Sequence, residues 1–226
     1  MQRVGVIVAA AGIASRMDGI EKLFADLGGK PVLAWCIDTF ESLQCVDRIV
    51  VALNQRNMTA GRALAVARDW RKCRFCLGGA RRQDSVRAAL SLLDDVDSVV
   101  VHDGDRPFVT VRMIQDGMAL LDEVEVAVTA VPLKDTVKVV DERCNVLRTL
   151  VRNRLRLVQT PQLLRMDVIR SVYGDVAEDA TDDAMLAERR GFRVKVYDGA
   201  YENIKITTPE DLVVARSIAQ RWRASS

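Results

Sequence analysis

The chain has 226 residues, of which 49% are hydrophobic, and this size and composition fit one large domain with a sizeable buried core. The 33 basic residues nearly balance the 31 acidic ones, and a formal charge of +2 argues against a protein that binds nucleic acid through a broad basic face. No apolar stretch approaches the length of a membrane span, so we expect no membrane partner. The initial run MQRVGVIVAAAG lacks the cleavage region of a secretory signal and is typical of a core strand.

The cysteines, at positions 36, 45, 73, 76 and 144, are odd in number and lack the spacing of a disulfide framework. We therefore expect reduced thiols and a cytoplasmic protein. Cys73 and Cys76 form a CxxC pair, but no second pair accompanies it and His102 is the sole histidine of the sequence. A metal or redox role for this pair is thus the weaker alternative.

Apolar, β-branched runs alternate with helical patterns over the first 131 residues. In chain order, the sequence predicts a strand at 4–10, a helix at 31–40, a strand at 47–54, a helix at 60–70, a short strand at 74–79, a helix at 84–93, a strand at 98–103, a helix at 111–121 and a strand at 124–131. Strands that are apolar on both faces and separated by helices indicate a parallel α/β sheet covered on both sides.

This alternation breaks after residue 131. Residues 135–152 show no helical stripe, and two β-rich runs flank the polar segment DERCN, which predicts a hairpin that projects from the sheet. The sequence then predicts a helix near 165–172, a helix at 181–191 that begins at Thr181, strands at 193–199 and 203–206, and a C-terminal helix opened by Thr208 and Pro209. No linker or repeat divides the chain, so we expect a single domain over 1–226.

Three polar segments that contain glycine, 12–22, 78–85 and 102–107, each follow a predicted strand, and ligands of parallel sheets bind at the carboxyl ends of strands. The first segment carries Gly12, Arg16 and Lys22, but it matches neither the dinucleotide fingerprint G-x-G-x-x-G nor a Walker P-loop. A backbone loop with two cations fits nucleotidyl transfer, because attack on an α-phosphate builds negative charge that fixed cations stabilise. The alternative is a glycine turn with two solvated cations.

The segment 102–107, HDGDRP, favours the phosphate interpretation. Asp103 leaves a core strand at its carboxyl end, where an acid is well placed for Mg²⁺ or a sugar hydroxyl. Arg106 follows three residues later and can pair with a substrate phosphate. The alternative is that Asp103 only caps the next turn.

Seven motifs occur in order: A-A-G-x-x-x-R-M…K, G-G-x-x-R-x-D-S-V, H-D-x-x-R-P, V-P-x-K-D-T-V-K, T-P-Q, T-D-D and N-I-K-I-T…P-E-D-L. Together, over about residues 4–215, they resemble the 2-C-methyl-D-erythritol 4-phosphate cytidylyltransferase family. The resemblance implies a mostly parallel, Rossmann-like α/β sheet flanked by helices, of the nucleotidyltransferase type, with a projecting β-hairpin arm at 135–152 that serves dimerisation. It also implies a reaction of CTP with methylerythritol phosphate, with Mg²⁺ as cofactor, that yields the CDP-alcohol and pyrophosphate for non-mevalonate isoprenoid biosynthesis.

The resemblance further implies roles for individual residues. Arg16 and Lys22 match the pair that stabilises the transition state, and Arg152 and Lys205 match the cations that position the methylerythritol phosphate. The residues implied to contact substrate are Ala10, Ala11 and Gly12 at CTP, Gly79, Arg82, Asp84 and Ser85 at the cytosine and ribose, and Asp103, Arg106, Thr136 and Thr160 at or near the methylerythritol, with Asp103 also facing the metal. In the family the arm, which here carries Thr136 and Arg152, reaches into the partner's site, so a homodimer with shared active sites is expected.

The chain departs from the family pattern at Ala14, where glycine is common, at Glu21, where proline is common, and at Asp105, where small residues are common. The alternatives are a cytidylyltransferase for ribitol 5-phosphate, a sugar-nucleotide transferase for UTP or GTP, and a non-catalytic nucleotide-binding protein. Lys134 and Lys138 fit the methylerythritol enzymes better than the ribitol enzymes. Retention of all four predicted catalytic cations argues against a non-catalytic protein.

Overall fold

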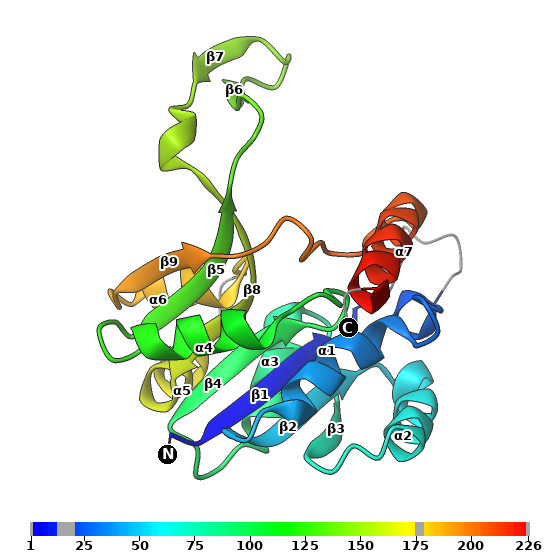
Figure 1. Ribbon diagram of the computed structural model, residues 1–226. Coiled ribbons are helices and arrows are strands. Elements are labelled where there is room, and N and C mark those ends of the chain that lie inside the picture. The colour runs from blue at the N-terminus through cyan, green and yellow to red at the C-terminus, as the bar shows by residue number, and fades with distance from the viewer. Residues whose placement is uncertain (1, 13–20, 175–178, 225–226) are drawn as a thin grey trace.

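The computed structural model of the protein describes residues 2–12, 21–174 and 179–224. Within these residues, a seven-stranded sheet has the order β3-β2-β1-β4-β8-β5-β9 (Figure 1). Its strands are β1 (Val4–Ala10), β2 (Val46–Leu53), β3 (Cys73–Leu77), β4 (Ser98–Asp103), β5 (Val126–Pro132), β8 (Arg156–Arg165) and β9 (Val194–Asp198). Strand β8 runs antiparallel to both of its neighbours, whereas the other pairs are parallel, which confirms the predicted mostly parallel sheet.

Helices cover both faces of this sheet, as Figure 1 shows. They are α1 (Val32–Ser42), α2 (Met58–Ala67), α3 (Arg82–Leu90), α4 (Val111–Leu120), α5 (Met166–Gly174), α6 (Asp183–Arg189) and α7 (Pro209–Ala224). Single 3₁₀ turns lie at η1 (Lys22–Phe24), η2 (Gln55–Asn57) and η3 (Arg152–Arg154). Helices α1, α2 and α4 pack in the core that contains Val6 and Val8 of β1, and helices α3, α5 and α6 pack in the core that contains Ile7. Strand β1 is therefore apolar on both faces, as its sequence predicts.

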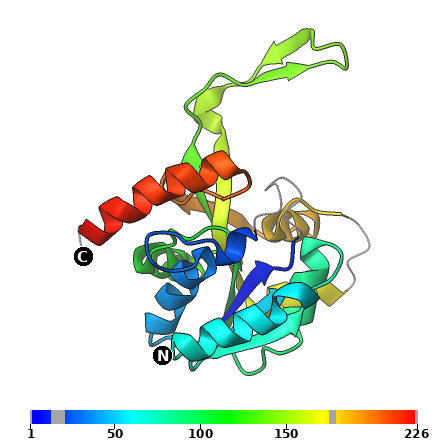
Figure 2. The same ribbon diagram turned by 90° about the vertical axis from the view of Figure 1, so that its right-hand side faces the viewer.

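The arm, residues 135–152, leaves the body between β5 and β8. Strands β6 (Lys138–Val140) and β7 (Val146–Thr149) pair antiparallel in a separate sheet, which confirms the predicted hairpin. Figures 1 and 2 show that this hairpin stands away from the body on extensions of β5 and β8. Its apolar side chains are largely exposed, with Leu147 at 63% and Val151 at 61%.

A third apolar cluster seats α7 at the same end of the body as the carboxyl ends of the parallel strands. Leu212 and Ile218 of this helix pack with Trp35 and Phe108, and the ring centroids of the last two lie 5.7 Å apart. Ile206 belongs to the same cluster, so the packing of α7 also anchors the segment that precedes it. This segment carries Lys205 to the edge of the sheet.

Three differences from the sequence prediction concern the second half of the chain. Strand β8 was not predicted, since Gln159, Thr160 and Gln162 interrupt its apolar pattern, yet all three are buried with hydrogen-bond partners. The predicted strand at 203–206 is wrong, because this segment bonds to separate loops rather than to a neighbouring strand. Helix α6 begins one residue after Asp182, whose side chain accepts a hydrogen bond from the Met185 amide; the predicted cap, Thr181, does not fill this role.

We find no helix in the described ranges with both the length and the apolar character needed to cross a bilayer.

Candidate active site

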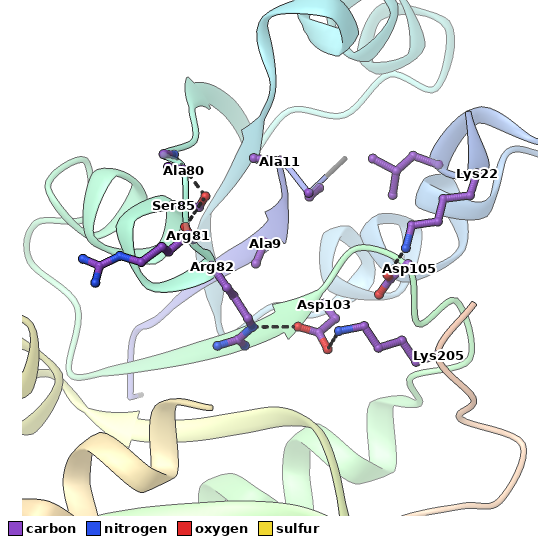
Figure 3. Close-up of a pocket in the computed structure, with 14 residues that line it drawn as sticks. Ala9, Ala11, Lys22, Ala80, Arg81, Arg82, Ser85, Asp103, Asp105 and Lys205 are labelled. Carbon is purple, nitrogen blue, oxygen red and sulfur yellow. Dashed lines mark hydrogen bonds and ion pairs between the residues drawn. The ribbon is translucent and has the colours of Figure 1, made fainter. Parts of the chain in front are cut away.

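The carboxyl ends of β1, β3 and β4 meet at one edge of the sheet, and a cavity of about 150 Å³ opens there (Figure 3). It is lined by Ala9, Ala10, Ala11, Gly12, Lys22, Leu23, Gly79, Ala80, Arg81, Arg82, Ser85, Asp103, Asp105 and Lys205. Each of the three polar segments that the sequence places after a strand thus contributes to one cavity. We refer to it as the first cavity.

Asp103, the last residue of β4, sits at the centre of a cluster of cations. One of its oxygens, Oδ1, accepts a hydrogen bond from Arg82 Nε at 3.0 Å, and Oδ2 accepts one from Lys205 Nζ at 3.0 Å. Arg106 Nε lies 3.5 Å from Oδ2. Burial alone would raise the pKa of Asp103, but the positive charges of Arg82, Lys205 and Arg106 outweigh burial and hold this pKa well below its usual range. The carboxylate is therefore ionised at neutral pH and orders three cations around itself.

Arg82, at the start of α3, is held from two sides. Its Nη2 lies 2.8 Å from Oδ2 of Asp183, a fully buried residue at the start of α6. The hydroxyl of Tyr173 donates a hydrogen bond to Oδ1 of the same carboxylate. Burial would lower the pKa of Arg82, but Asp183 and Asp103 raise it well above its usual value, so the guanidinium remains charged. This arrangement presents a fixed positive charge to the cavity.

The 78–85 segment approaches the first strand very closely. A Cβ added to Gly78 would lie 2.2 Å from the Cβ of Ala11 and 2.7 Å from Ser85 Oγ, so only glycine fits. The Gly79 amide donates a hydrogen bond to Ser85 Oγ at 3.1 Å, which fixes the turn before α3. The segment therefore packs directly against Ala11, the residue that follows β1.

A second cavity, of about 230 Å³, adjoins the first and shares three residues with it. It is lined by Arg82, Asp103, Arg106, Val158, Gln159, Thr160, Gln162, Thr181, Asp182 and Lys205. The shared residues Arg82, Asp103 and Lys205 form a charged wall between the two cavities. Two ligands on opposite sides of this wall would lie next to each other.

His102 forms hydrogen bonds to two residues that line the second cavity, Arg106 and Thr160. Its Nε2 donates to the Arg106 carbonyl at 2.9 Å, and its Nδ1 accepts from Thr160 Oγ1 at 3.0 Å, an assignment in which every partner has a consistent role. Thr160 Oγ1 in turn accepts a hydrogen bond from the Asp103 amide at 3.0 Å. Burial lowers the pKa of His102 to about 4, so the ring is neutral at pH 7. It therefore orders Thr160 and Arg106 as a neutral hydrogen-bonding group.

Most of the predicted site residues meet at these two cavities. Those that line one or both cavities are Ala10, Ala11, Gly12, Lys22, Gly79, Arg82, Ser85, Asp103, Arg106, Thr160 and Lys205. Asp84 is absent from both linings, and its carboxylate pairs with Arg81, 2.9 Å away, in the cap of α3. Thr136 and Arg152 are exposed on the arm, where Arg152 Nη1 donates to the Lys134 carbonyl. Arg16 lies outside the described residues, as does Ala14.

The sequence does not predict several of the residues that contribute to the site. Asp183 belongs to the T-D-D motif, but its pairing with Arg82 joins two distant parts of the chain and has no local signature. Gln159 and Gln162 lie on the strand that was not predicted. Asp105 was noted as a departure, and the structure places its carboxylate 2.5 Å from Lys22 Nζ.

The carboxylate predicted to face Mg²⁺, Asp103, already accepts hydrogen bonds on both oxygens. In the described parts of the chain, no group of three or more His, Cys, Asp or Glu side chains is arranged to hold a metal. This donor set fits the usual binding mode of Mg²⁺ at nucleotides, in which substrate phosphates and water supply most ligands and the protein adds one or two carboxylates. The residues therefore fit a metal that arrives with a triphosphate.

A mostly parallel sheet with a cation-lined cavity at the carboxyl ends of its strands defines an α/β protein of the nucleotidyltransferase type. The model of one family, "IspD: 2-C-methyl-D-erythritol 4-phosphate cytidylyltransferase", matches residues 4–221. Relatives with this enzyme name include proteins of Dehalococcoides mccartyi, 42% identical with 98% of each chain covered, and Bacillus mycoides, 39% identical with 94% of this chain and 96% of that protein covered. The chain belongs to the 2-C-methyl-D-erythritol 4-phosphate cytidylyltransferase family.

Solved structures agree with this assignment. The 4-diphosphocytidyl-2C-methyl-D-erythritol synthase of Anaerococcus prevotii has a TM-score of 0.87 at 29% identity, with 97% of this chain and 96% of that chain covered. The 2-C-methyl-D-erythritol 4-phosphate cytidylyltransferase of Thermus thermophilus has a TM-score of 0.77 at 28% identity, with 97% and 100% covered. The fold is thus shared along nearly the whole chain.

Proposed function

We propose that the protein transfers the cytidylyl group of CTP to the phosphate of 2-C-methyl-D-erythritol 4-phosphate and releases pyrophosphate, a step of non-mevalonate isoprenoid precursor biosynthesis. The observation that carries this proposal is the pair of adjoining cavities with a common wall of Arg82, Asp103 and Lys205. The first cavity, between the end of β1 and the 78–85 segment, would take CTP. The second, which contains Arg106 and Thr160, would take the acceptor.

The reaction needs orientation and charge stabilisation more than proton transfer. An oxygen of the acceptor phosphate, already anionic at neutral pH, attacks the α-phosphorus of CTP and forms the new P–O bond. The bond from the α-phosphorus to the oxygen that bridges it to the β-phosphate breaks, and pyrophosphate leaves with the electron pair. Lys22 and Arg16 would stabilise the charge that develops on the α-phosphoryl oxygens, and Lys205 and Arg152 would hold the acceptor phosphate.

Mg²⁺ belongs to the same proposal. Asp103 would be its protein ligand, and the metal would neutralise charge on the phosphate oxygens of CTP. Because Asp103 is ionised and held by Arg82 and Lys205, its position is set before a nucleotide binds. The described residues thereby offer a carboxylate of fixed position without a preformed metal site among them.

The arm supports a homodimer with shared active sites. Thr136 and Arg152 are exposed on the arm, outside the two cavities, while Val146, Leu147 and Val151 expose 59–63% of their surface. A two-stranded hairpin is marginally stable alone in water, so a partner that covers these side chains would stabilise it. We propose that each arm packs on a second copy and brings Arg152 to the partner's acceptor cavity. The five free cysteines support a cytoplasmic location.

Pyrophosphate release tests the proposal against its alternatives. The purified protein is given CTP or UTP, each with methylerythritol phosphate or ribitol 5-phosphate, with Mg²⁺ and then with a chelator. We expect pyrophosphate to be released only in the mixture of CTP and methylerythritol phosphate, and we expect the chelator to abolish this release. Equal rates with ribitol 5-phosphate would support the ribitol enzyme, equal rates with UTP would support a different nucleotide, and no release in any mixture would support a non-catalytic protein.

A further inference from the structure

Lys22, the first residue of η1, holds its ammonium group between two acceptors from different parts of the chain. Its Nζ donates to Asp105 Oδ2 at 2.5 Å and to the Ile206 carbonyl at 3.0 Å. Only 14% of the Lys22 side chain and 11% of the Asp105 side chain are exposed, so this ion pair is largely shielded from water. Figure 3 shows both side chains at the edge of the first cavity, with the lysine reaching down to the carboxylate.

The two acceptors are themselves joined. The Ile206 amide donates a hydrogen bond to the Asp105 carbonyl at 2.9 Å. Lys22, Asp105 and Ile206 therefore form a closed triangle between the end of the 12–22 segment, the turn after β4 and the segment before α7. Lys205, which reaches Asp103 from that last segment, precedes Ile206 directly.

The pairing is strong on electrostatic grounds. Asp105 Oδ1 is buried and has no hydrogen-bond partner among the residues that the structure describes, which leaves Lys22 as the main compensation of the carboxylate charge. A buried charge without its counterion is costly, so the ammonium group is held at this position. An ammonium has three N–H donors, and two are used by Asp105 and Ile206. The third remains for a ligand in the cavity that Lys22 lines.

We propose that Asp105 is a positioning residue, which fixes the Lys22 ammonium so that its third N–H meets the α-phosphate of the nucleotide in the transition state. This inference rests on the proposed function, in which Lys22 stabilises that transition state. It goes beyond it by assigning a role to a residue that departs from the family pattern. Fixing a cation in place raises turnover, because the donor needs no reorganisation when charge develops.

Glu21, the residue before Lys22, allows a second test of this proposal. It is exposed, with φ −77° and ψ 89°, and its amide donates no hydrogen bond to any of the residues that the structure describes. Proline fixes φ near −65° and removes the amide donor, so it fits this position. Glu21→Pro would restrain the backbone next to Lys22 and take over part of the restraint that Asp105 supplies from the opposite side.

The test begins with Asp105→Asn, which keeps the size of the side chain and removes its charge. We expect kcat to fall about tenfold while KM for CTP stays within about twofold, because orientation in the transition state is lost while ground-state contacts persist. Glu21→Pro in this background should restore a measurable part of kcat. The matched control is Asp38→Asn, which weakens a half-buried pair with Lys30 and Arg68 away from both cavities and should leave kcat unchanged.

A double-mutant cycle with Lys22→Gln separates positioning from general damage. If Asp105 acts through Lys22, Asp105→Asn adds no further loss of kcat in the Lys22→Gln background. Full additivity of the two losses overturns the proposal, as does unchanged kcat in Asp105→Asn. Tighter CTP binding with unchanged kcat also overturns it, since the carboxylate would then merely compete with phosphate for Lys22. An inactive wild-type protein, or an active Lys22→Gln variant, instead refutes the proposed function or the role of Lys22.

Discussion

The body and the arm differ in how their site residues are held. In the body, charged groups of the site are ordered by one another: Asp103 collects Arg82 and Lys205, and Arg82 is anchored on the buried Asp183. Arg152 of the arm donates a hydrogen bond to the carbonyl of Lys134, the residue just before the arm, and apolar side chains of the arm such as Leu147 are largely exposed. The described site residues of the body are therefore ordered within one chain, whereas the arm exposes an apolar surface that we propose a second copy covers. We expect a substitution at the site residues of the body to act within its own chain, and a substitution on the arm to act on the partner chain, through assembly or through the partner's site.

The strongest test of this difference between body and arm is complementation between a variant of each region. Lys22→Ala in the body and Arg152→Ala on the arm should each lower turnover roughly a hundredfold or more, because each removes a fixed cation from the transition state. Unfolded and refolded together in equal amounts, the two variants form mixed dimers in half of all random pairings. One site of each mixed dimer carries both lesions and the other carries none, so about a quarter of wild-type activity should return.

The control for this experiment is each variant refolded alone, with subunit exchange shown by tags of different mass. If the arm serves its own chain, every site keeps one lesion and mixing restores nothing. That outcome, with subunit exchange demonstrated, would show that the arm contributes to the site of its own chain, and the proposed shared site would be wrong.

Leu147→Asp tests the apolar surface of the arm alone. A charge at this exposed position should prevent burial against a second copy, so the protein should sediment as a monomer and lose at least about tenfold in specific activity at low concentration. The body should remain folded, with unchanged far-ultraviolet circular dichroism. Glu142→Ala, an exposed polar position on the same arm, is the matched control. A Leu147→Asp protein that stays dimeric with full activity would place the interface elsewhere.

Gly78→Ala tests the close approach inside the body. The added Cβ would lie 2.2 Å from Ala11 Cβ, so the end of β1 or the 78–85 segment must shift where CTP is proposed to bind. We expect KM for CTP to rise about tenfold, with a smaller change in kcat, measured by steady-state pyrophosphate release. Gly174→Ala is the control, since no atom of the described residues lies within 4 Å of the place that its Cβ would take. Equal behaviour of the two variants would show that the close approach is unrelated to the nucleotide.

The smallest expected effect concerns pH and the buried His102. Burial lowers its pKa to about 4 in the folded protein, below the unfolded value of about 6.5, so the unfolded chain binds the additional proton as the pH falls. The stabilisation is therefore complete above pH 6.5 and is lost progressively toward pH 4. Between pH 7 and pH 5 the free energy of unfolding should fall by about 2 kcal/mol, measured by urea denaturation.

The His102→Gln variant, which lacks the titrating ring, should show a much flatter profile over the same range. Asp103 does not contribute in this window, because its depressed pKa acts only as the pH approaches the usual range of aspartate. The arm has no histidine, so dimer dissociation should not change between pH 7 and pH 5. A profile of His102→Gln as steep as that of the wild type would assign the pH effect to other groups.

The sequence predicted the parts of the body that depend on local pattern. Strands such as Val4–Ala10 and Ser98–Asp103 are recognisable because both faces are apolar, and the carboxyl ends of parallel strands meet, which brought Lys22, Asp103 and Ser85 to one cavity. The projecting hairpin was predicted from a break in the alternation. The segment 135–152 lacks a helical stripe, and its strands β6 and β7 pair antiparallel as predicted.

What the sequence did not reveal depends on contacts between distant segments. Strand Arg156–Arg165 carries polar side chains that are satisfied only in the folded protein, as when Gln162 Nε2 donates to Asp182, so its burial has no local pattern. The triangle of Lys22, Asp105 and Ile206 likewise joins three segments that are far apart in the chain. Whether Thr136 and Arg152 reach a partner's site stays a prediction, which the complementation experiment addresses.

The common wall of the two cavities has a consequence for the design of inhibitors. Arg82, Asp103 and Lys205 line both cavities, so a ligand in one would lie close to a ligand in the other. A compound with a pyrimidine nucleoside at one end, a phosphorylated polyol at the other and a short uncharged linker could occupy both at once. Its second half would bind at an effective concentration of about millimolar, set by the linker rather than by the dose. Shortening or lengthening the linker by single atoms would then measure the thickness of the wall in solution.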